Sequence, residues 1–168
     1  GNAAESQVQL DTYGELLDCV KICEVMDDQS LRDAWPHFRR LIDYVADHWR
    51  EADSGIWEVR DRPRQFVHTK VQCWVAFDRG IRLVDSLGLQ GDARRWRREA
   101  ARLRGEVDSE GLTPGGWFAR SYGSSDVDAA LLTLPTLGYV AGDDQRMLAT
   151  IEAIREQLSI HGAVTPGL

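Results

Sequence analysis

The sequence predicts an all-α fold of about six helices, in which buried and half-exposed helices alternate along the chain. Apolar residues recur at helical spacing in six segments, and no stretch shows the strict alternation of a half-buried strand. Three of these segments are apolar on most sides, and the three between them carry a single apolar stripe. The connections alternate in step, short after a buried helix and long after a half-exposed one. Together these patterns predict repeated helical hairpins.

The buried helices are predicted at about 11–26, 65–87 and 125–140. Helices with apolar residues on most sides are buried on most sides. In the last of the three, Pro135 is expected to kink or end the helix, because proline cannot donate a main-chain hydrogen bond. The middle one is the most apolar and contains Phe66, Val67, Val71, Cys73, Trp74, Val75, Phe77, Ile81, Leu83, Val84 and Leu87.

The half-exposed helices are predicted at about 30–49, 92–106 and 143–158. Each has apolar residues along one face and charged residues around the rest, so we expect one side of each to face solvent. The helix at 92–106 is the clearest example, because its stripe is surrounded by Arg94, Arg95, Arg97, Arg98, Arg102 and Arg104.

The long connections, 50–64 and 108–124, are predicted to emerge at one end of the hairpin array, together with both chain termini. Repeated hairpins with an inner and an outer helix build either a concentric ring or a solenoid. Successive inner helices lie about 55–60 residues apart, well beyond the ~34-residue tetratricopeptide period, and no hairpin repeats the sequence of another. Both points disfavour a short-repeat solenoid. Long loops on a rigid scaffold are where functional residues collect.

Composition excludes several classes of protein. With 20 Lys and Arg against 27 Asp and Glu, the net charge is −7, which disfavours a nucleic-acid binder. No apolar run reaches the length of a membrane span, and no signal peptide opens the chain, so we expect a cytoplasmic protein without membrane contact. Cys19, Cys23 and Cys73 lack metal-ligand spacing and are interpreted as reduced core thiols. Neither a cofactor-binding motif nor a metal-ligating histidine pair is present, so no cofactor and no metal are predicted.

The connection at 50–64 combines aromatic and charged residues in a way that suits a sugar. Trp57 offers a ring for the apolar face of a pyranose, while Glu58 and Arg60 offer groups for its hydroxyls. From the residues alone, Glu58 is more typical of a solvated surface group, and Trp57 is more typical of a loop anchor than of a ligand platform. An arginine-rich nucleic-acid patch is a further alternative, but the arginines of 92–106 circle their helix instead of lining one face.

Three blocks of sequence, in order, resemble a known family. The first is Gln-Leu-Asp-Thr-Tyr-Gly-Glu-Leu-Leu-Asp at 9–18. The second is Gly-Ile-Trp-Glu-Val-Arg at 55–60, followed by His-Thr-Lys-Val at 68–71 and Trp-Val-Ala-Phe-Asp-Arg at 74–79. The third is Ser-Tyr-Gly at 121–123 with Asp-Val-Asp-Ala-Ala-Leu-Leu at 126–132. They resemble the bacterial glucoamylase and trehalase-like branch of glycoside hydrolase family 15 over about 1–158. The tail at 159–168 is unlike that family.

This resemblance implies an (α/α)6 toroid, a ring of six helical hairpins with inner and outer helices, of which the chain would form about half. It implies an inverting hydrolase acting on starch-type α-glucans or on trehalose. By the same resemblance, Glu58 aligns with the general acid, which protonates the leaving glycosidic oxygen. Trp57 and Arg60 would flank the sugar, and Tyr13, His68 and Lys70 are candidate pocket residues.

The resemblance also implies that the catalytic base lies in a later motif, which this chain does not contain. We therefore expect 1–158 to be a fragment of the catalytic domain, carrying the acid without the base and inactive alone. Its two open edges are expected to expose apolar surface and to pack against the rest of the toroid or against a second copy. The alternative is a non-catalytic helical scaffold or carbohydrate-binding half-toroid.

Overall fold

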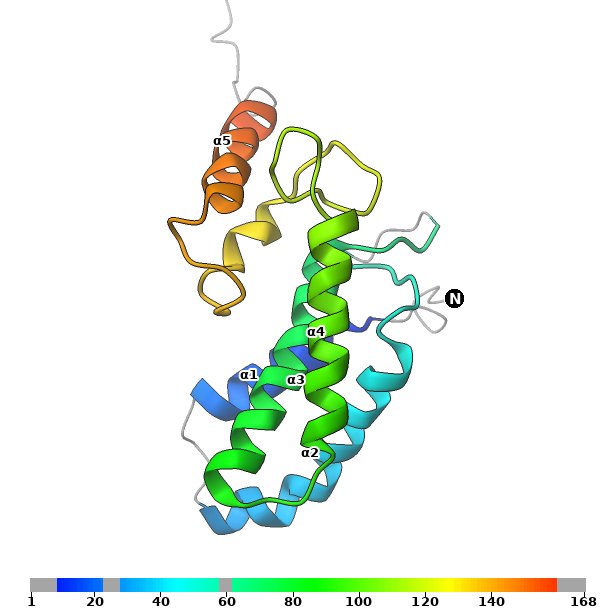
Figure 1. The fold of residues 1–168 in the computed structure, drawn as a ribbon, viewed down its shortest axis with the longest axis vertical. Helices are drawn as coiled ribbons and strands as arrows, with labels where there is room; N and C mark the ends of the chain where they lie inside the picture. The colour runs from blue at the N-terminus through cyan, green and yellow to red at the C-terminus, as the bar shows by residue number, and fades with distance from the viewer. Residues whose placement is uncertain (1–8, 23–27, 58–61, 160–168) are drawn as a thin grey trace, which may run out of the picture.

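The structure, a computed structural model, describes residues 9–22, 28–57 and 62–159. Within these residues the regular elements are all helices and there is no β-strand, which confirms the predicted all-α class. Figure 1 shows two long antiparallel helices at the centre of the molecule, with the remaining helices around them. The elements, in chain order, are α1 (Asp11–Ile22), α2 (Asp28–His48), α3 (Val67–Leu87), α4 (Ala93–Glu110), the 3-10 helix η2 (Ala129–Thr133) and α5 (Gln145–Ser159).

Helix α3 is the centre of the fold, as its all-round apolar sequence predicts. Buried residues lie on all its faces, and α1, α2 and α4 all pack against it. The helix begins after Phe66 and ends at Gly88, which adopts a left-handed conformation (φ 64°) that suits glycine at a helix end. The short turn that follows leads directly into α4. Inner and outer helices are therefore joined by a tight turn here, as the sequence predicts.

The outer helices α2 and α4 each bury one stripe. On α4 the stripe consists of Trp96, Ala100, Leu103 and Val107, and most of the surrounding arginines are exposed. The indole N–H of Trp96 donates to Asp43 of α2 over 2.8 Å. The buried carboxylate of Glu99 is compensated by Arg50 and Arg102, each 3.0 Å away. The predicted single-stripe character of these two helices is confirmed.

The prediction of a continuous helix at 125–140 is wrong. Only Ala129–Thr133 is helical, as the short 3-10 helix η2, and consecutive turns follow it. Pro135 cannot donate to the carbonyl of Leu131, which a continuing α-helix requires. Gly138 then adopts φ 75°, outside the right-handed helical region. The expectation that Pro135 would kink or end this helix agrees with the end of η2 at Thr133, whereas the predicted bounds and α-helical form do not.

Helix α1 is less buried than its predicted inner position requires. It packs against α3 and α2, but Leu16 is 42% exposed and Cys19 is exposed, so Cys19 is not the core thiol that the sequence predicted. Cys73, on α3, is fully buried as expected. Cys23 and the predicted continuation of this helix to residue 26 lie outside the described residues.

Exposed leucines also occur at the other end of the chain, on η2 and α5. Leu132, Leu148 and Leu158 are each more than two-fifths exposed. These positions and Leu16 lie on the elements where the sequence predicts open apolar edges. Packing of those edges against the rest of a toroid or a second copy stays a prediction. None of the helices in the described ranges combines the length and apolar character needed to cross a membrane.

The two long connections lie side by side at one end of the central helices, as the loop lengths predict (Figure 1). The main-chain N–H of Tyr122 donates to the carbonyl of Gln65 over 3.0 Å, and the N–H of Val67 donates to the carbonyl of Arg120 over 3.1 Å. The second connection thus meets the first where α3 begins. This end of the fold carries most of the residues that the sequence singled out.

Candidate functional site

Three elements begin at this end of the molecule, and each brings a polar residue to its first turn or its cap. Asp11 opens α1, His68 lies in the first turn of α3, and Asp128 caps η2. The negative charges of the Asp11 and Asp128 carboxylates both favour the protonated form of the His68 imidazole. The three groups therefore lie close enough to interact electrostatically. Asp11 and His68 are buried, at 4% and 5% exposed. The starts of α1, α3 and η2 therefore converge on a group of polar side chains.

Burial governs the protonation of His68. It lowers the pKa of the imidazole below its ordinary 6.5, and the nearby carboxylates of Asp11 and Asp128 oppose this only in part. The ring is therefore neutral at neutral pH. Its Nδ1 atom has no hydrogen-bond partner among the described residues, although the atom is buried. A neutral imidazole with a spare nitrogen can donate to or accept from a hydroxyl group.

A second carboxylate, Asp53, joins three parts of the site. Its side chain accepts the hydroxyl proton of Thr69 on α3 (3.0 Å) and the main-chain N–H of Leu10, just before α1 (3.4 Å). Its main chain pairs with Arg64 in both directions, at 3.0 and 2.9 Å, and so closes the base of the connection that carries Trp57 and Glu58. At 2% exposed, Asp53 fixes this connection to the starts of both inner helices.

Burial also makes Asp53 sensitive to pH. Desolvation, helped by the nearby charge of Asp11, raises the pKa of this carboxyl from 3.8 to about 6, despite the opposing hydrogen bond from Thr69. The folded protein thus holds this proton more tightly than the unfolded chain does. The free energy of unfolding therefore falls as pH rises from about 4 to about 6, by about 3 kcal/mol at most.

We expect Asp53→Asn to remove this pH dependence, because an amide does not ionise and its oxygen still accepts from Thr69. The measurement is urea unfolding of parent and variant at pH 4 and pH 7. Relative to the parent, the variant should gain about 2 kcal/mol in the free energy of unfolding between pH 4 and pH 7, because the unfolded carboxyl is already partly ionised at pH 4. Asp143→Asn, an exposed carboxylate in the turn before α5, is the matched control. Equal pH dependence in the parent and Asp53→Asn would contradict the role of this carboxyl.

Trp57 is held at its polar end and exposed over its ring. Its indole N–H donates to both carboxylate oxygens of Asp128, at 3.0 and 2.8 Å, while 61% of the residue is exposed. The indole N–H thus ties this connection to the start of η2, as a loop anchor would, while the exposed ring stays accessible, as a ligand platform requires. The ring borders a pocket of about 280 Å³, lined by Trp57, Arg120, Val127, Asp128, Ala129 and Leu158. An exposed aromatic face beside polar groups is suited to a sugar ring.

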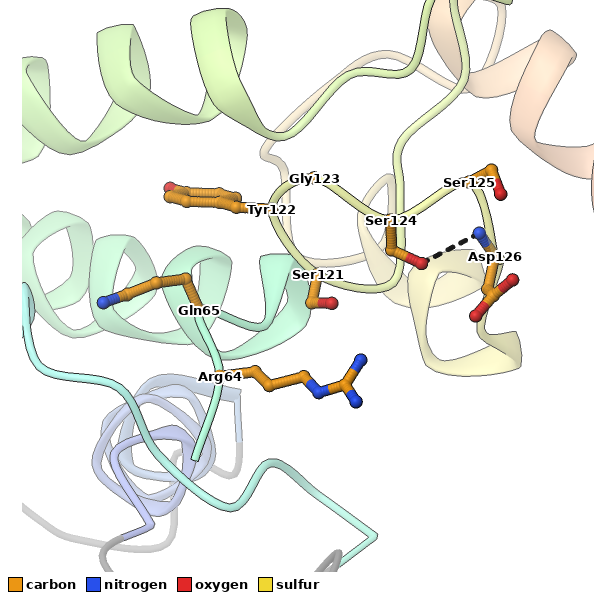
Figure 2. Close-up of a pocket in the computed structure, with 8 residues that line it drawn as sticks. All are labelled: Arg64, Gln65, Ser121, Tyr122, Gly123, Ser124, Ser125 and Asp126. Carbon is orange, nitrogen blue, oxygen red and sulfur yellow. Dashed lines mark hydrogen bonds between the residues drawn. The ribbon is translucent and has the colours of Figure 1, made fainter. Parts of the chain in front are cut away.

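A larger pocket of about 570 Å³ lies between the two long connections (Figure 2). It is lined by Arg64, Gln65, Ser121, Tyr122, Gly123, Ser124, Ser125 and Asp126. Figure 2 shows the side chains of Tyr122 and Gln65 directed to one side, and those of Arg64, Ser124 and Asp126 to the other. The Ser124 hydroxyl accepts from the main-chain N–H of Asp126 over 3.0 Å. Polar groups dominate this lining, which makes it suited to hydroxyl-rich ligands.

The remaining predicted site residues are distributed unequally. Lys70 is 1% exposed, and its ammonium donates to the main-chain carbonyls of Trp49 and Glu51 at the end of α2. Tyr13 is half-buried, and its ring lies 5.4 Å from that of Tyr44 on α2, centroid to centroid.

Glu58 and Arg60 lie outside the described residues, so their assigned roles stay predictions. Among the described residues, no group of three or more His, Cys, Asp or Glu side chains is placed to hold a metal ion.

The sequence did not single out Asp53 and Asp128 as site residues. Asp53 is one of several carboxylates in a charged connection, and nothing in the spacing distinguishes it. Asp128 gave a weak signal, because an Asp just before an apolar run is typical of a helix cap. Its contact with Trp57, 71 residues away, depends on the fold.

Comparison with known proteins places the chain in a family. The family model described as glycosyl hydrolases family 15 matches residues 1–168. The chain belongs to this family.

Trehalases are among the curated relatives of this family 15 chain. The trehalase of Mycobacterium tuberculosis is 36% identical over 164 residues, which cover 98% of this chain and 24% of the relative. The trehalase of Thermoplasma acidophilum is 32% identical over 163 residues, 96% of this chain and 28% of the relative. The family 15 chain thus spans about a quarter of the length of these relatives.

Solved structures of glycosidases have a fold similar to that of the family 15 chain. A glycosidase variant in complex with glucose matches with a TM-score of 0.76 at 23% identity, over 89% of this chain and 40% of that one. A wild-type glycosidase matches with a TM-score of 0.69, also at 23% identity and with the same coverage. These matches confirm the predicted fold class, a partial helical toroid.

Proposed function

We propose that this chain is the acid-bearing part of an inverting α-glucosidase whose substrate is trehalose. The trehalases among its curated relatives, matched along nearly the whole chain, carry this proposal. The geometry supports it, because an exposed indole and a set of buried polar groups meet where the inner elements begin. A disaccharide without a reducing end presents just such apolar ring faces and hydroxyls.

Glu58 is the general acid in this proposal. It delivers a proton to the glycosidic oxygen as the bond from that oxygen to the anomeric carbon breaks. Trp57, next to it in the chain, covers the apolar face of the sugar, and Arg60 pairs with hydroxyls. His68 and Tyr13 complete the pocket. Lys70 acts through the main chain, because its ammonium holds carbonyls at the end of α2.

Inversion needs a second carboxylate as general base. In inverting enzymes the acid and base lie roughly 6.5–9.5 Å apart, which leaves room for a water molecule between the base and the sugar. The base takes a proton from that water, whose oxygen bonds to the anomeric carbon on the face opposite the leaving group. We assign this base to a part of the toroid outside residues 1–168, so the proposed activity belongs to the intact gene product.

The test is hydrolysis of trehalose by the intact gene product, followed by proton NMR. An inverting enzyme releases one β-glucose and one α-glucose from each trehalose before mutarotation equalises them. If both glucose molecules released from trehalose were initially the α-anomer, inversion would be contradicted. A strong preference for maltose or starch would favour the α-glucan alternative. No release from any of these sugars, together with measurable sugar binding by calorimetry, would favour the non-catalytic alternative.

A further inference from the structure

The hydrogen bond between Trp57 and Asp128 joins the two long connections at the candidate site. Most of the indole is exposed, so packing alone does not hold the ring in one orientation. The two short contacts from its N–H to the carboxylate, at 3.0 and 2.8 Å, are the described hydrogen bonds of this side chain. A hydrogen bond to a charged acceptor is stronger than one to a neutral acceptor.

Asp128 is itself firmly placed. One carboxylate oxygen accepts the main-chain N–H of Ala130 over 2.9 Å, which caps η2. The Nε atom of Arg120 lies 3.7 Å from the other oxygen. Arg120 is fixed in turn by main-chain hydrogen bonds to Val67 and Asp126, at 3.1 and 2.7 Å. The side chain of Asp128 is 12% exposed, so this carboxylate offers Trp57 a rigid acceptor.

We propose that Asp128 is a positioning residue that fixes the indole of Trp57 as one wall of the sugar pocket. This inference rests on the proposed function, because it assigns the bordering pocket of about 280 Å³ to the substrate. In this proposal Asp128 affects sugar binding by orienting Trp57, and its own carboxylate does not contact the sugar. A cap of η2 without this role would stabilise the fold and leave substrate affinity unchanged.

Asp128→Asn separates the two roles. Asn and Asp are equally good helix caps, so the variant keeps η2 capped, while a neutral amide oxygen binds the indole N–H more weakly. In the intact gene product we expect KM for trehalose to rise about tenfold, with kcat changed less than about twofold. The urea midpoint of unfolding should fall no further than it does when another indole–carboxylate bond of the fold is weakened in the same way.

A double-mutant cycle with Trp57→Phe tests whether the effect passes through the indole. Phe keeps an aromatic ring but has no N–H to donate. In the Trp57→Phe background, Asp128→Asn should change KM less than about twofold, because the hydrogen bond is already absent. An equal tenfold rise in both backgrounds would overturn the proposal, as would a fall in kcat at unchanged KM.

Asp43→Asn is the matched control. Asp43 accepts the indole N–H of Trp96 over 2.8 Å, in the packing between α2 and α4 and not at the candidate site. This variant should lower the urea midpoint and leave KM unchanged. A tenfold rise in KM here would mean that loss of any tryptophan–carboxylate bond disturbs the site through stability, which would overturn the specific role of Asp128.

A readout independent of turnover separates this inference from the proposed function. In protein labelled with 15N-tryptophan, the indole peak of Trp57 is the one that Trp57→Phe removes. Asp128→Asn should shift this peak, and adding trehalose should shift it in the parent. No glucose release with both shifts present would overturn the proposed function alone. An indole peak that is indifferent to both Asp128→Asn and trehalose would overturn the positioning role.

Discussion

Glu58→Gln in the intact gene product should lower kcat for trehalose by a factor of about 10² to 10⁴, with KM nearly unchanged. Gln matches Glu in shape but has no proton to give to the glycosidic oxygen, and general acid catalysis contributes rate enhancements of about that size. Stopped assays of glucose release, with parent and variant at equal concentration, measure both constants. The loss should be specific to sugars whose leaving group needs a proton.

α-Glucosyl fluoride provides the decisive comparison, because fluoride leaves without protonation. Glu58→Gln should retain most of the parent rate on this substrate. Glu51→Gln is the matched control, since Glu51 is an exposed carboxylate in the same connection. It should behave as the parent does on both substrates. A Glu58→Gln variant with parental kcat on trehalose would remove Glu58 from the mechanism, and equal losses on both substrates would argue against its role as an acid.

Gly14→Ala should destabilise the fold by about 3 kcal/mol, at the upper end of the cost of overpacking a core. A methyl group at Gly14 on α1 would lie 2.1 Å from the main-chain carbonyl oxygen of Gln72 on α3. Main-chain atoms inside a helix cannot move aside as a flexible side chain can, so α1 would have to move away from α3. Urea unfolding followed by circular dichroism measures the change.

Gly105→Ala serves as the control for the intrinsic effect of replacing glycine in a helix. Gly105 lies on α4, and apart from the adjoining main chain of its own helix nothing lies within 4 Å of the position of an added methyl group. Alanine there should stabilise the protein by about 0.5–1 kcal/mol, because glycine loses more conformational freedom on folding. If Gly14→Ala behaved in the same way, the close contact between α1 and α3 would be absent in solution.

Helix prediction succeeded where local patterns act alone. The bounds predicted for α2, α3 and α5 differ from the observed ones by at most two residues, because apolar periodicity and helix ends are local signals. It failed at 125–140, where a proline and a glycine interrupt an apolar run. Apolar content predicts burial, and buried residues here include Leu131 and Leu134. It does not by itself predict a helix.

Some residues of the candidate site could be predicted from the sequence, and others could not. Trp57 and His68 were predicted from residue type and resemblance, and the structure brings both to the end where the inner elements begin. Asp53 and Asp128 were not, although one fixes the base of the connection that carries Trp57 and the other binds its indole. Many exposed loops contain aspartates, so composition gives no reason to select these two.

The sequence by itself determined the all-α class, the buried central helix between two single-stripe helices, and the family, because each is written in residue patterns within single segments or in ordered motifs. Only the tertiary structure decided which carboxylates serve the site. Leu10 and Asp53 are 43 residues apart, and Trp57 and Asp128 are 71 apart. Such contacts form when packing around α3 brings distant segments together, and no periodicity within one segment encodes them.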